Sequence, residues 1–204
     1  MADNFTSGGS TFRADDVGAA VLAQVVKLDV GADGVELWAS GESALAALPV
    51  TPRFKRSRLA VTPTVSTTPA YSRGDAVGSV MTFTSAARAS GGSGMVRGVA
   101  LVDKSSEQPG LDLVLFTTTV ASVTDNNVFD PTDAELATFV GLVRLPGVGG
   151  WARFNDNSAT SVACEIPYLC AATSLFGVLV ARDAPFPTFA AATDLVVTLT
   201  VDLD

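Results

Sequence analysis

The sequence predicts an all-β protein: a jelly-roll-like antiparallel β-sandwich with one short helix and an extended N-terminal arm. Three observations predict it. β-Branched and aromatic residues gather in short runs, turn-forming residues separate these runs regularly, and the last run alternates apolar and polar residues. The 204 residues are 48% hydrophobic, so a sizeable core is available. We see no repeat of fixed period, which argues against a propeller or a solenoid.

Residues 1–58 are predicted to form the arm and a linker. Residues 1–11 are small and polar, which favours a tail that is flexible or ordered by a partner. The apolar stretch 19–30 ends at a turn marked by Gly31 and Gly34, and its last part, residues 25–30, alternates as a strand does. Because this quarter of the chain has few places to fold back, we expect it to pack on another surface.

The run "RFKRSR" (residues 53–58) holds four of the 13 basic residues. It favours a solvated linker between arm and body. The alternatives are a nucleic-acid patch and a salt-dependent contact with an acidic partner. A net charge of -8 argues against non-specific nucleic-acid binding, which depends on neutralising phosphates with Lys and Arg.

Residues 59–204 are predicted to form the sandwich. The last run shows the clearest period of two, with Leu195, Val197 and Leu199 on one face and Thr198 and Thr200 on the other. About eight strands in one body are typical of a jelly roll. The expected strands lie within residues 59–66, 70–84, 95–104, 111–122, 159–167, 174–183 and 194–204.

The acidic cluster "DNNVFDPTDAEL" (residues 125–136) has the composition of a metal site or an acid–base pair. The EF-hand spacing fails, since Phe129 and Leu136 occupy positions that need ligands. A short helix explains the cluster better: Asp130 caps it, Pro131 takes its first position, and acids fill its first turn. Leu136, Phe139 and Val140 would then form one apolar stripe that packs Phe139 on the sandwich.

Several classes of chemistry are excluded or weakened. The chain has no histidine, which removes Ser-His-Asp triads and histidine metal sites. Cys164 and Cys170 are predicted to be buried free thiols, with a disulfide as the alternative. Arg73-Gly74-Asp75 is interpreted as ordinary turn chemistry, and "RFNDNSATS" (residues 153–161) as a loop, with a sugar or ion site as the alternative. We expect no metal and no cofactor.

No apolar run reaches the roughly 20 residues of a membrane helix. The first residues also lack the basic and apolar regions of a signal peptide. We therefore expect no membrane contact and synthesis in a cytoplasm.

Two stretches carry a resemblance. "TFRADDVGAAVLAQVVKLDVGADG" (residues 11–34), followed by "ALAALPV", resembles the opening of small structural proteins of tailed bacteriophages. There an "AD[DE]VGG" element leads to "VKL..GADG" and a "PLPV"-like segment; "ADDVGAA" lacks the second glycine. The body is similar to the β-rich body of these proteins over "GDAVGSVMTFTSAARASGGSG", "VALVDKSSEQPGLDLVLF" and the last 32 residues, "TSLFG…VDLD".

The resemblance implies a non-enzymatic virion component, made in the host cytoplasm and placed on the capsid surface. Its implied role is that of a decoration (cement) protein that binds the major capsid protein and other copies of itself. The symmetry of capsid sites favours a trimer. The alternative for the apolar arm residues is packing on their own sandwich. The residues implied to bind a partner are Phe12, Val17, Val21, Leu22, Val25, Val26, Leu28, Arg53, Lys55, Arg56 and Arg58.

Two other functions compete with this interpretation. One is a tail or baseplate component, or a receptor- or glycan-binding module, which the same fold class also serves. Glycan sites usually carry exposed aromatic side chains, and only Trp38, Trp151, Tyr71 and Tyr168 accompany the phenylalanines. The other is a carboxylate hydrolase, which needs two acids roughly 5–10 Å apart, and no pair in the sequence stands out.

Overall fold

The computed structural model describes residues 55–183 and 186–204 with their side chains, and five short strands within residues 1–50 by backbone alone. Two compact units result, Met1–Pro52 and Arg53–Asp204. In the first unit, β1 (Asn4–Ser7) pairs with β2 (Ser10–Asp16), β2 with β3 (Leu22–Gln24), and β4 (Leu28–Asp29) with β5 (Glu36–Leu37). Within residues 1–11, predicted to form a tail, the structure has β1 and the start of β2.

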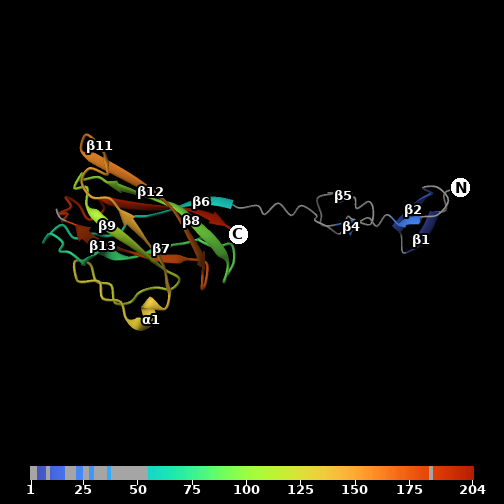
Figure 1. The fold of residues 1–204 in the computed structure, drawn as a ribbon, viewed down its shortest axis with the longest axis horizontal. Coiled ribbons are helices and arrows are strands. Elements are labelled where there is room, and N and C mark those ends of the chain that lie inside the picture. Colours follow the sequence, from blue (N-terminus) through green and yellow to red (C-terminus); the bar gives the residue numbers. More distant parts are fainter. Residues whose placement is uncertain are drawn as a thin grey trace. The chain divides into compact units, whose positions relative to one another are not determined.

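The second unit consists of two antiparallel sheets (Figure 1), which confirms the predicted all-β sandwich. The strand order is β10-β9-β13-β7 in the four-stranded sheet and β11-β12-β8-β14-β6 in the five-stranded sheet. The strands are β6 (Lys55–Val61), β7 (Ala76–Phe83), β8 (Ser93–Asp103), β9 (Gly110–Phe116), β10 (Phe139–Leu145), β11 (Ala152–Phe154), β12 (Asn157–Leu169), β13 (Leu175–Asp183) and β14 (Leu195–Leu203).

The path of the chain between the sheets is that of a jelly roll. Apart from β9 to β10 and β11 to β12, each strand of this unit is followed by one in the other sheet. Each crossing brings strands distant in sequence together, and the first strand of the unit, β6, lies beside the last, β14. The predicted jelly-roll-like topology is therefore present.

The core lies between the two sheets. The alternation expected in residues 195–203 is confirmed, since Leu195, Val197, Leu199 and Val201 are fully buried. Each such side chain contributes roughly 1.5–3 kcal/mol relative to full exposure. The main cluster also takes the facing side chains of β8, β9 and β13.

A second apolar cluster lies on the outer face of the four-stranded sheet. Alternate residues of β9 serve the two clusters: Leu113 and Leu115 point into the main core, whereas Val114 and Phe116 belong to the second cluster. The connection from β9 to β10 covers this outer face with Val120 and Phe129, and the ring of Phe129 lies edge-on to Phe116 at 6.2 Å between centroids. This covering explains why β9 is apolar on both faces.

Asp125 holds the covering connection to the sandwich. Its Oδ1 accepts hydrogen bonds from the Tyr71 hydroxyl at 2.7 Å and the Gly78 N–H at 2.6 Å, and its Oδ2 accepts one from the Ser66 hydroxyl. Three donors therefore converge on one carboxylate, which accepts but does not donate when ionised. The first acid of the cluster at residues 125–136 is a structural acceptor.

The predicted helix is present as α1 (Asp133–Leu136), but its cap is Thr132 and not Asp130. The Thr132 hydroxyl accepts the Glu135 N–H at 3.3 Å, and the Glu135 carboxylate accepts the Thr132 N–H at 2.8 Å. This reciprocal capping box requires a Ser or Thr followed three residues later by a Glu or Gln. Asp130 does not meet this requirement, because the residue three positions after it is Asp133.

The apolar stripe expected on this helix is wrong. The helix ends after one turn, and Phe139 and Val140 belong to β10. Phe139 does pack on the sandwich, since its ring lies edge-on to Phe116 at 6.2 Å. Pairing of β10 with β9 along Leu111–Phe116 outweighed the helical spacing of these residues.

Two further expectations are corrected. The linker predicted for residues 53–58 is wrong from Lys55 onward, because β6 begins there and pairs with β14 along its whole length. The loop predicted for residues 153–161 is a hairpin of β11 and β12, and only Asn155 and Asp156 form its turn. Asn155 has a φ of 53°, a left-handed conformation that Asn adopts more readily than most residues.

Candidate functional site

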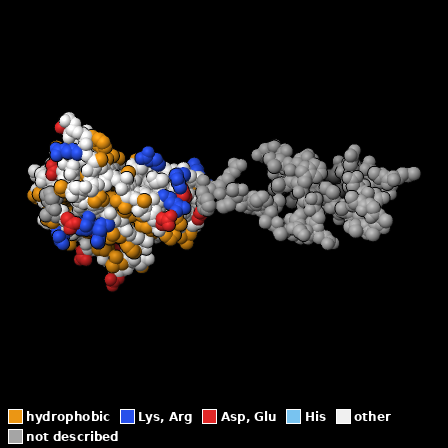
Figure 2. All heavy atoms as spheres, turned by 45° about the horizontal axis from the view of Figure 1, so that its top comes forward, with side chains coloured by type: hydrophobic (Ala, Val, Ile, Leu, Met, Phe, Trp, Pro, Cys, Tyr) orange, Lys and Arg blue, Asp and Glu red, His pale blue; other side chains and the backbone are white. Residues whose placement is uncertain are grey.

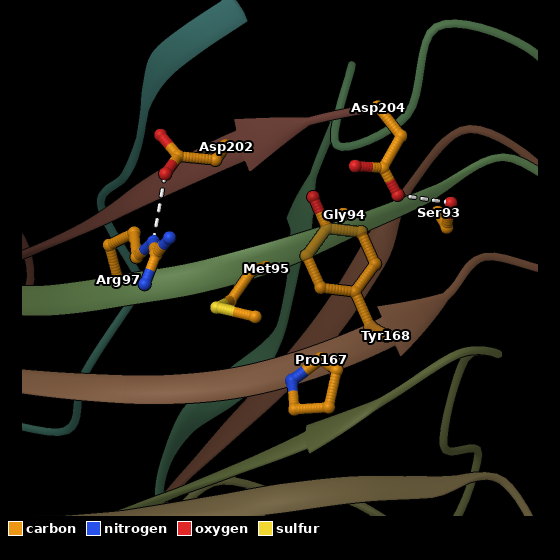
Figure 3. Close-up of a pocket in the computed structure, with 8 residues that line it drawn as sticks. All are labelled: Ser93, Gly94, Met95, Arg97, Pro167, Tyr168, Asp202 and Asp204. Atoms are coloured by element: carbon orange, nitrogen blue, oxygen red, sulfur yellow. Dashed lines mark hydrogen bonds and ion pairs between the residues drawn. The ribbon is translucent and has the colours of Figure 1, made fainter. Parts of the chain in front are cut away.

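A small pocket lies on the outer face of the five-stranded sheet, where β8, β12 and β14 run side by side (Figure 3). We call it the β8–β12 pocket. Its volume is about 240 Å³, below the roughly 300–1,000 Å³ of most small-molecule sites. It therefore fits one or two protein side chains better than a metabolite. Its lining residues are Ser93, Gly94, Met95, Arg97, Pro167, Tyr168, Asp202 and Asp204.

A β-bulge in β8 places Arg97 at this pocket. Thr200 of β14 pairs with Gly98, and the next residue, Val201, pairs with Val96, so Arg97 has no partner in this ladder. The extra residue reverses the alternation of β8, and both Val96 and Val99 point into the core. Arg97 is thereby directed outward between β12 and β14.

A network of four charged side chains borders the pocket. Arg56 binds Asp202 through two hydrogen bonds, Nε to Oδ1 at 2.8 Å and Nη2 to Oδ2 at 3.0 Å. Arg97 binds the same carboxylate through Nε at 2.8 Å and reaches Glu165 through Nη1 at 2.7 Å. The network connects β6, β8, β12 and β14, so it fixes the edge strand to three others.

The two arginines set the protonation of Asp202. The pKa of the Asp202 carboxyl is lowered to about 2, most strongly by the hydrogen bond from Arg56 and next by the hydrogen bond from Arg97. This is the opposite of the raised pKa that a general acid at neutral pH requires. The Asp202 side chain is only 10% exposed.

Tyr168 lines the pocket and also belongs to the main core cluster. Its hydroxyl donates a hydrogen bond to the Ala86 carbonyl at 2.6 Å, and burial raises its pKa, so it stays a neutral donor. The Ser93 hydroxyl donates to the Asp204 carboxylate. Met95 and Pro167 are the apolar side chains of the lining outside the core, and Figure 3 shows them on the neighbouring strands β8 and β12.

Most of the sequence-predicted binding residues lie in the first unit. Val17, Val21, Val25, Val26 and Arg53 lie outside the described residues. Phe12, Leu22 and Leu28 belong to β2, β3 and β4, whose side chains are likewise outside the description.

Three predicted binding residues lie in β6. Arg56 is engaged by Asp202, whereas Lys55 and Arg58 are exposed, with no ion pair within the described residues. The network partners Arg97, Glu165 and Asp202 were missed. The sequence signal for the bulge in β8 is the pair Arg97-Gly98 in "MVRGV", a charged residue and a glycine within an apolar strand.

The other sequence motifs have structural roles. Gly74 adopts a φ of +88°, and the buried Asp75 accepts the Ser72 N–H, so Arg73-Gly74-Asp75 is a turn as predicted. Cys164 and Cys170 are free thiols as predicted; Cys170 is buried and Cys164 half-buried, and burial raises both pKa values.

The tryptophan and tyrosine side chains considered for a glycan site are buried where the structure describes them. Tyr71, Trp151 and Tyr168 are at most 8% exposed, and the Trp151 indole donates to the Pro146 carbonyl at 2.7 Å. Trp38 lies outside the described residues.

Within residues 55–183 and 186–204, no three His, Cys, Asp or Glu side chains are grouped so as to hold a metal ion. In the same part of the chain, no helix has the length and apolar character needed to cross a bilayer.

No protein-family model matches the sequence, and no curated protein matches it. Among solved structures, a chain from "Structure of infectious bursal disease virus Gt strain" matches with 12% identity and a TM-score of 0.20. The match covers 94% of this chain and 51% of that chain, so this chain spans about half the length of the one it matches. A TM-score this low shows no shared fold.

Proposed function

We propose that this chain is a non-enzymatic structural protein of a bacteriophage particle, a capsid decoration protein that binds and stabilises the shell. The observation that carries the proposal is the way the jelly-roll body begins. Its first strand, β6, starts three residues after the boundary of the N-terminal unit and is an edge strand of the five-stranded sheet. Whatever the N-terminal unit binds is therefore connected directly to an edge of the body.

That edge strand is bound to its neighbours along its whole length. β6 pairs with β14 over seven residues, and the Arg56–Asp202–Arg97 contacts clamp it to the strands beyond. A force on the preceding chain must break these contacts together before β6 leaves the sheet. A protein that clamps neighbouring shell subunits needs this kind of anchorage, because many copies then share the load with modest affinity each.

The resemblance of residues 11–34 to the opening of phage structural proteins supports the same proposal. The small pocket on the body, with its internally paired polar groups, is suited to contact with protein side chains. The expected partners are the major capsid protein and further copies of this chain, and the expected location is the outer surface of the capsid.

The test is immunogold labelling of intact particles from the source, followed by melting of shells with and without the full-length protein. Gold distributed over the heads, with a rise in shell melting temperature on adding protein, supports the decoration role. No gold on intact particles, or unchanged melting despite full occupancy, would overturn it.

A tail, baseplate or receptor-binding role is the second candidate. The tip of the β11–β12 hairpin favours it, because Arg153, Phe154, Asn155 and Asp156 are all exposed there, as residues of a contact loop are. Gold confined to the tails, with adsorption to host cells lost in a Phe154→Ala variant, would select this role over decoration.

A further inference from the structure

The core of the body is complete without its first strand. None of the residues of β6 is buried, and no buried member of the main core cluster within the described residues comes from this strand. Leu59 and Val61 pack against the cluster but stay half-buried. β6 is also an edge strand, and β14 is its one partner among the described strands. Edge elements with few buried side chains open locally at low cost, so β6 can leave the sheet while the other strands stay packed.

A second arginine holds the acceptor group of β14 independently of β6. Arg56 of β6 donates to both carboxylate oxygens of Asp202, at 2.8 and 3.0 Å, and Arg97 of β8 donates to the same carboxylate at 2.8 Å. Figure 3 shows the Arg97 contact, and Figure 2 shows basic and acidic side chains gathered at the end of the body where β6 begins. A guanidinium that binds a carboxylate at two points fixes one orientation. The edge of β14 is therefore a preformed acceptor for a strand with an arginine at the position of Arg56.

Residues 62–64 form the hinge between β6 and the rest of the body. Val65, which follows, is buried and donates its N–H to the Ala192 carbonyl at 3.0 Å. Pro63 is buried against Gly78, where an added Cβ would lie 2.8 Å from the Cβ of Pro63. Proline also fixes its own φ and restricts the preceding residue to extended conformations. The pivot is therefore confined to the residue that directly follows β6, and short hinges favour the exchange of an element between copies.

We propose that two copies of this chain exchange β6, so that β6 of each copy pairs with β14 of the other. The occupant of the β14 edge follows from contacts already present in one copy, namely the register of β6 on β14 and the contact of Arg56 with Asp202. An exchanged strand makes the same contacts and needs no new complementary surface. Because the pivot is short, the two hinges lie side by side in a two-fold dimer, in which each copy both donates and accepts a strand. Residues 1–52 are joined to β6 through the chain, so exchange links whatever they bind to the neighbouring body.

This inference rests on the proposed function for the partner it names, a further copy of the chain, but its test needs no shell. An exchanged dimer that fails to bind shells would overturn the proposed function and leave this inference standing. Binding and stabilisation of shells by a protein that never exchanges β6 would do the reverse.

The experiment locks β6 onto its own sheet in the full chain. Ala60 and Thr198 are aligned on β6 and β14, and directly opposed residues of antiparallel strands are close enough for a disulfide. The Ala60→Cys/Thr198→Cys variant, oxidised at low concentration, holds β6 in place, and its reduced form leaves β6 free. After incubation at high concentration, analytical ultracentrifugation should find at least about tenfold less dimer in the oxidised form, because exchange requires β6 to leave. The wild type, given both treatments, controls for Cys164 and Cys170 and should dimerise equally in the two.

A mixing measurement covers the case in which the double variant folds poorly. The single variants Ala60→Cys and Thr198→Cys are incubated together at high concentration and then oxidised, and exchange should link the two chains covalently. The control mixture, Ala60→Cys with Asp156→Cys, should give several-fold less of the linked product. A wild type that stays monomeric after long incubation at high concentration would overturn the proposal. So would a locked protein that dimerises as readily as its reduced form, or equal cross-linking in the two mixtures.

Discussion

At the scale of single residues, carboxylates that the sequence leaves ambiguous act as hydrogen-bond acceptors. Asp125 receives three donors from the connection between β6 and β7 and from β7 itself, and Asp202 receives two arginines. Neither role is visible from neighbouring residues, because the donors lie 47 to 146 positions away. Both acids hold segments of the body in place.

Replacing Asp125 with alanine is expected to lower the free energy of unfolding by about 1–3 kcal/mol, because three buried or half-buried donors lose their acceptor. Urea denaturation of the two proteins measures the difference. Asp156→Ala, in the exposed hairpin turn, serves as the control and should change stability by less than about 0.5 kcal/mol. Equal effects of the two substitutions would contradict the role assigned to Asp125.

Gly94 lies where the backbone passes beneath Tyr168. A Cβ at this position would meet the Asp202 carbonyl oxygen at 2.6 Å and also the Tyr168 hydroxyl. Gly94→Ala is therefore expected to destabilise the body by about 1–3 kcal/mol through overpacking. Gly147→Ala, whose Cβ would find its nearest neighbour at 3.5 Å, is the matched control in thermal unfolding. A Gly94→Ala protein as stable as this control would rule out the close packing.

At the scale of elements, two short segments depend on side chains rather than on their own propensity. The edge strand β6 is fixed by the Arg56–Asp202 pair, and α1, a single turn with no buried residue, is fixed by Glu135. The Glu135 carboxylate also accepts the N–H groups of Ala121 and Ser122, so it connects the helix to the start of the covering connection.

Acid is expected to weaken the hold on β6. The pKa of Asp202 falls from an ordinary 3.8 to about 2 on folding, so its contribution is complete above pH 4 and is lost as the pH falls towards 2. The stability difference between wild type and Asp202→Asn should therefore shrink between pH 4 and pH 2. Urea unfolding across this range measures it, and a difference independent of pH would contradict the assignment.

Glu135→Ala is expected to open the start of the covering connection. Its carboxylate has a pKa lowered to about 2, mainly by the Thr132 N–H, so it is ionised and a strong acceptor at neutral pH. Without it, the amides of Ala121 and Ser122 should exchange with solvent several-fold faster in a hydrogen-exchange experiment. Asp133→Ala, in the same turn but not bonded to these amides, should leave their exchange rates unchanged.

At the scale of the whole molecule, the body is held by apolar contact between two sheets and not by cross-links. Cys164 and Cys170 are unpaired, and the buried clusters occupy the space between the sheets and beneath the covering connection. The crossing chain path brings β6 and β14 together, so the strand that follows the N-terminal unit is locked in place by the last strand of the chain.

The thermal midpoint of the full chain is accordingly expected to be the same with and without a reductant. A structural disulfide in a small domain typically contributes 2–5 kcal/mol, which would be lost on reduction. Calorimetry with and without dithiothreitol measures the difference. A midpoint that falls by several degrees under reducing conditions would show that the thiols pair.

The sequence by itself determined the features that depend on neighbouring residues. The alternation of residues 195–203 determined which side of β14 is buried, and the turn residues separated the strands correctly in most of the body. A helix was expected at the acidic cluster and is present, because capping depends on residues three positions apart. The two cysteines were correctly predicted to be free.

Only the tertiary structure decided the features that depend on register between distant strands. Residues 139–145 have a helical spacing of apolar side chains at their start, yet pairing with β9 makes them a strand. Lys55–Arg58 have the composition of a linker, yet β14 offers them an edge to pair with. At the β8–β12 pocket, a one-residue bulge directs Arg97 toward an aspartate 105 positions later. The local sequence specifies which face of a strand is apolar and where turns occur. Pairing between distant strands specifies which strands become neighbours, and this pairing brings the residues of the candidate site together.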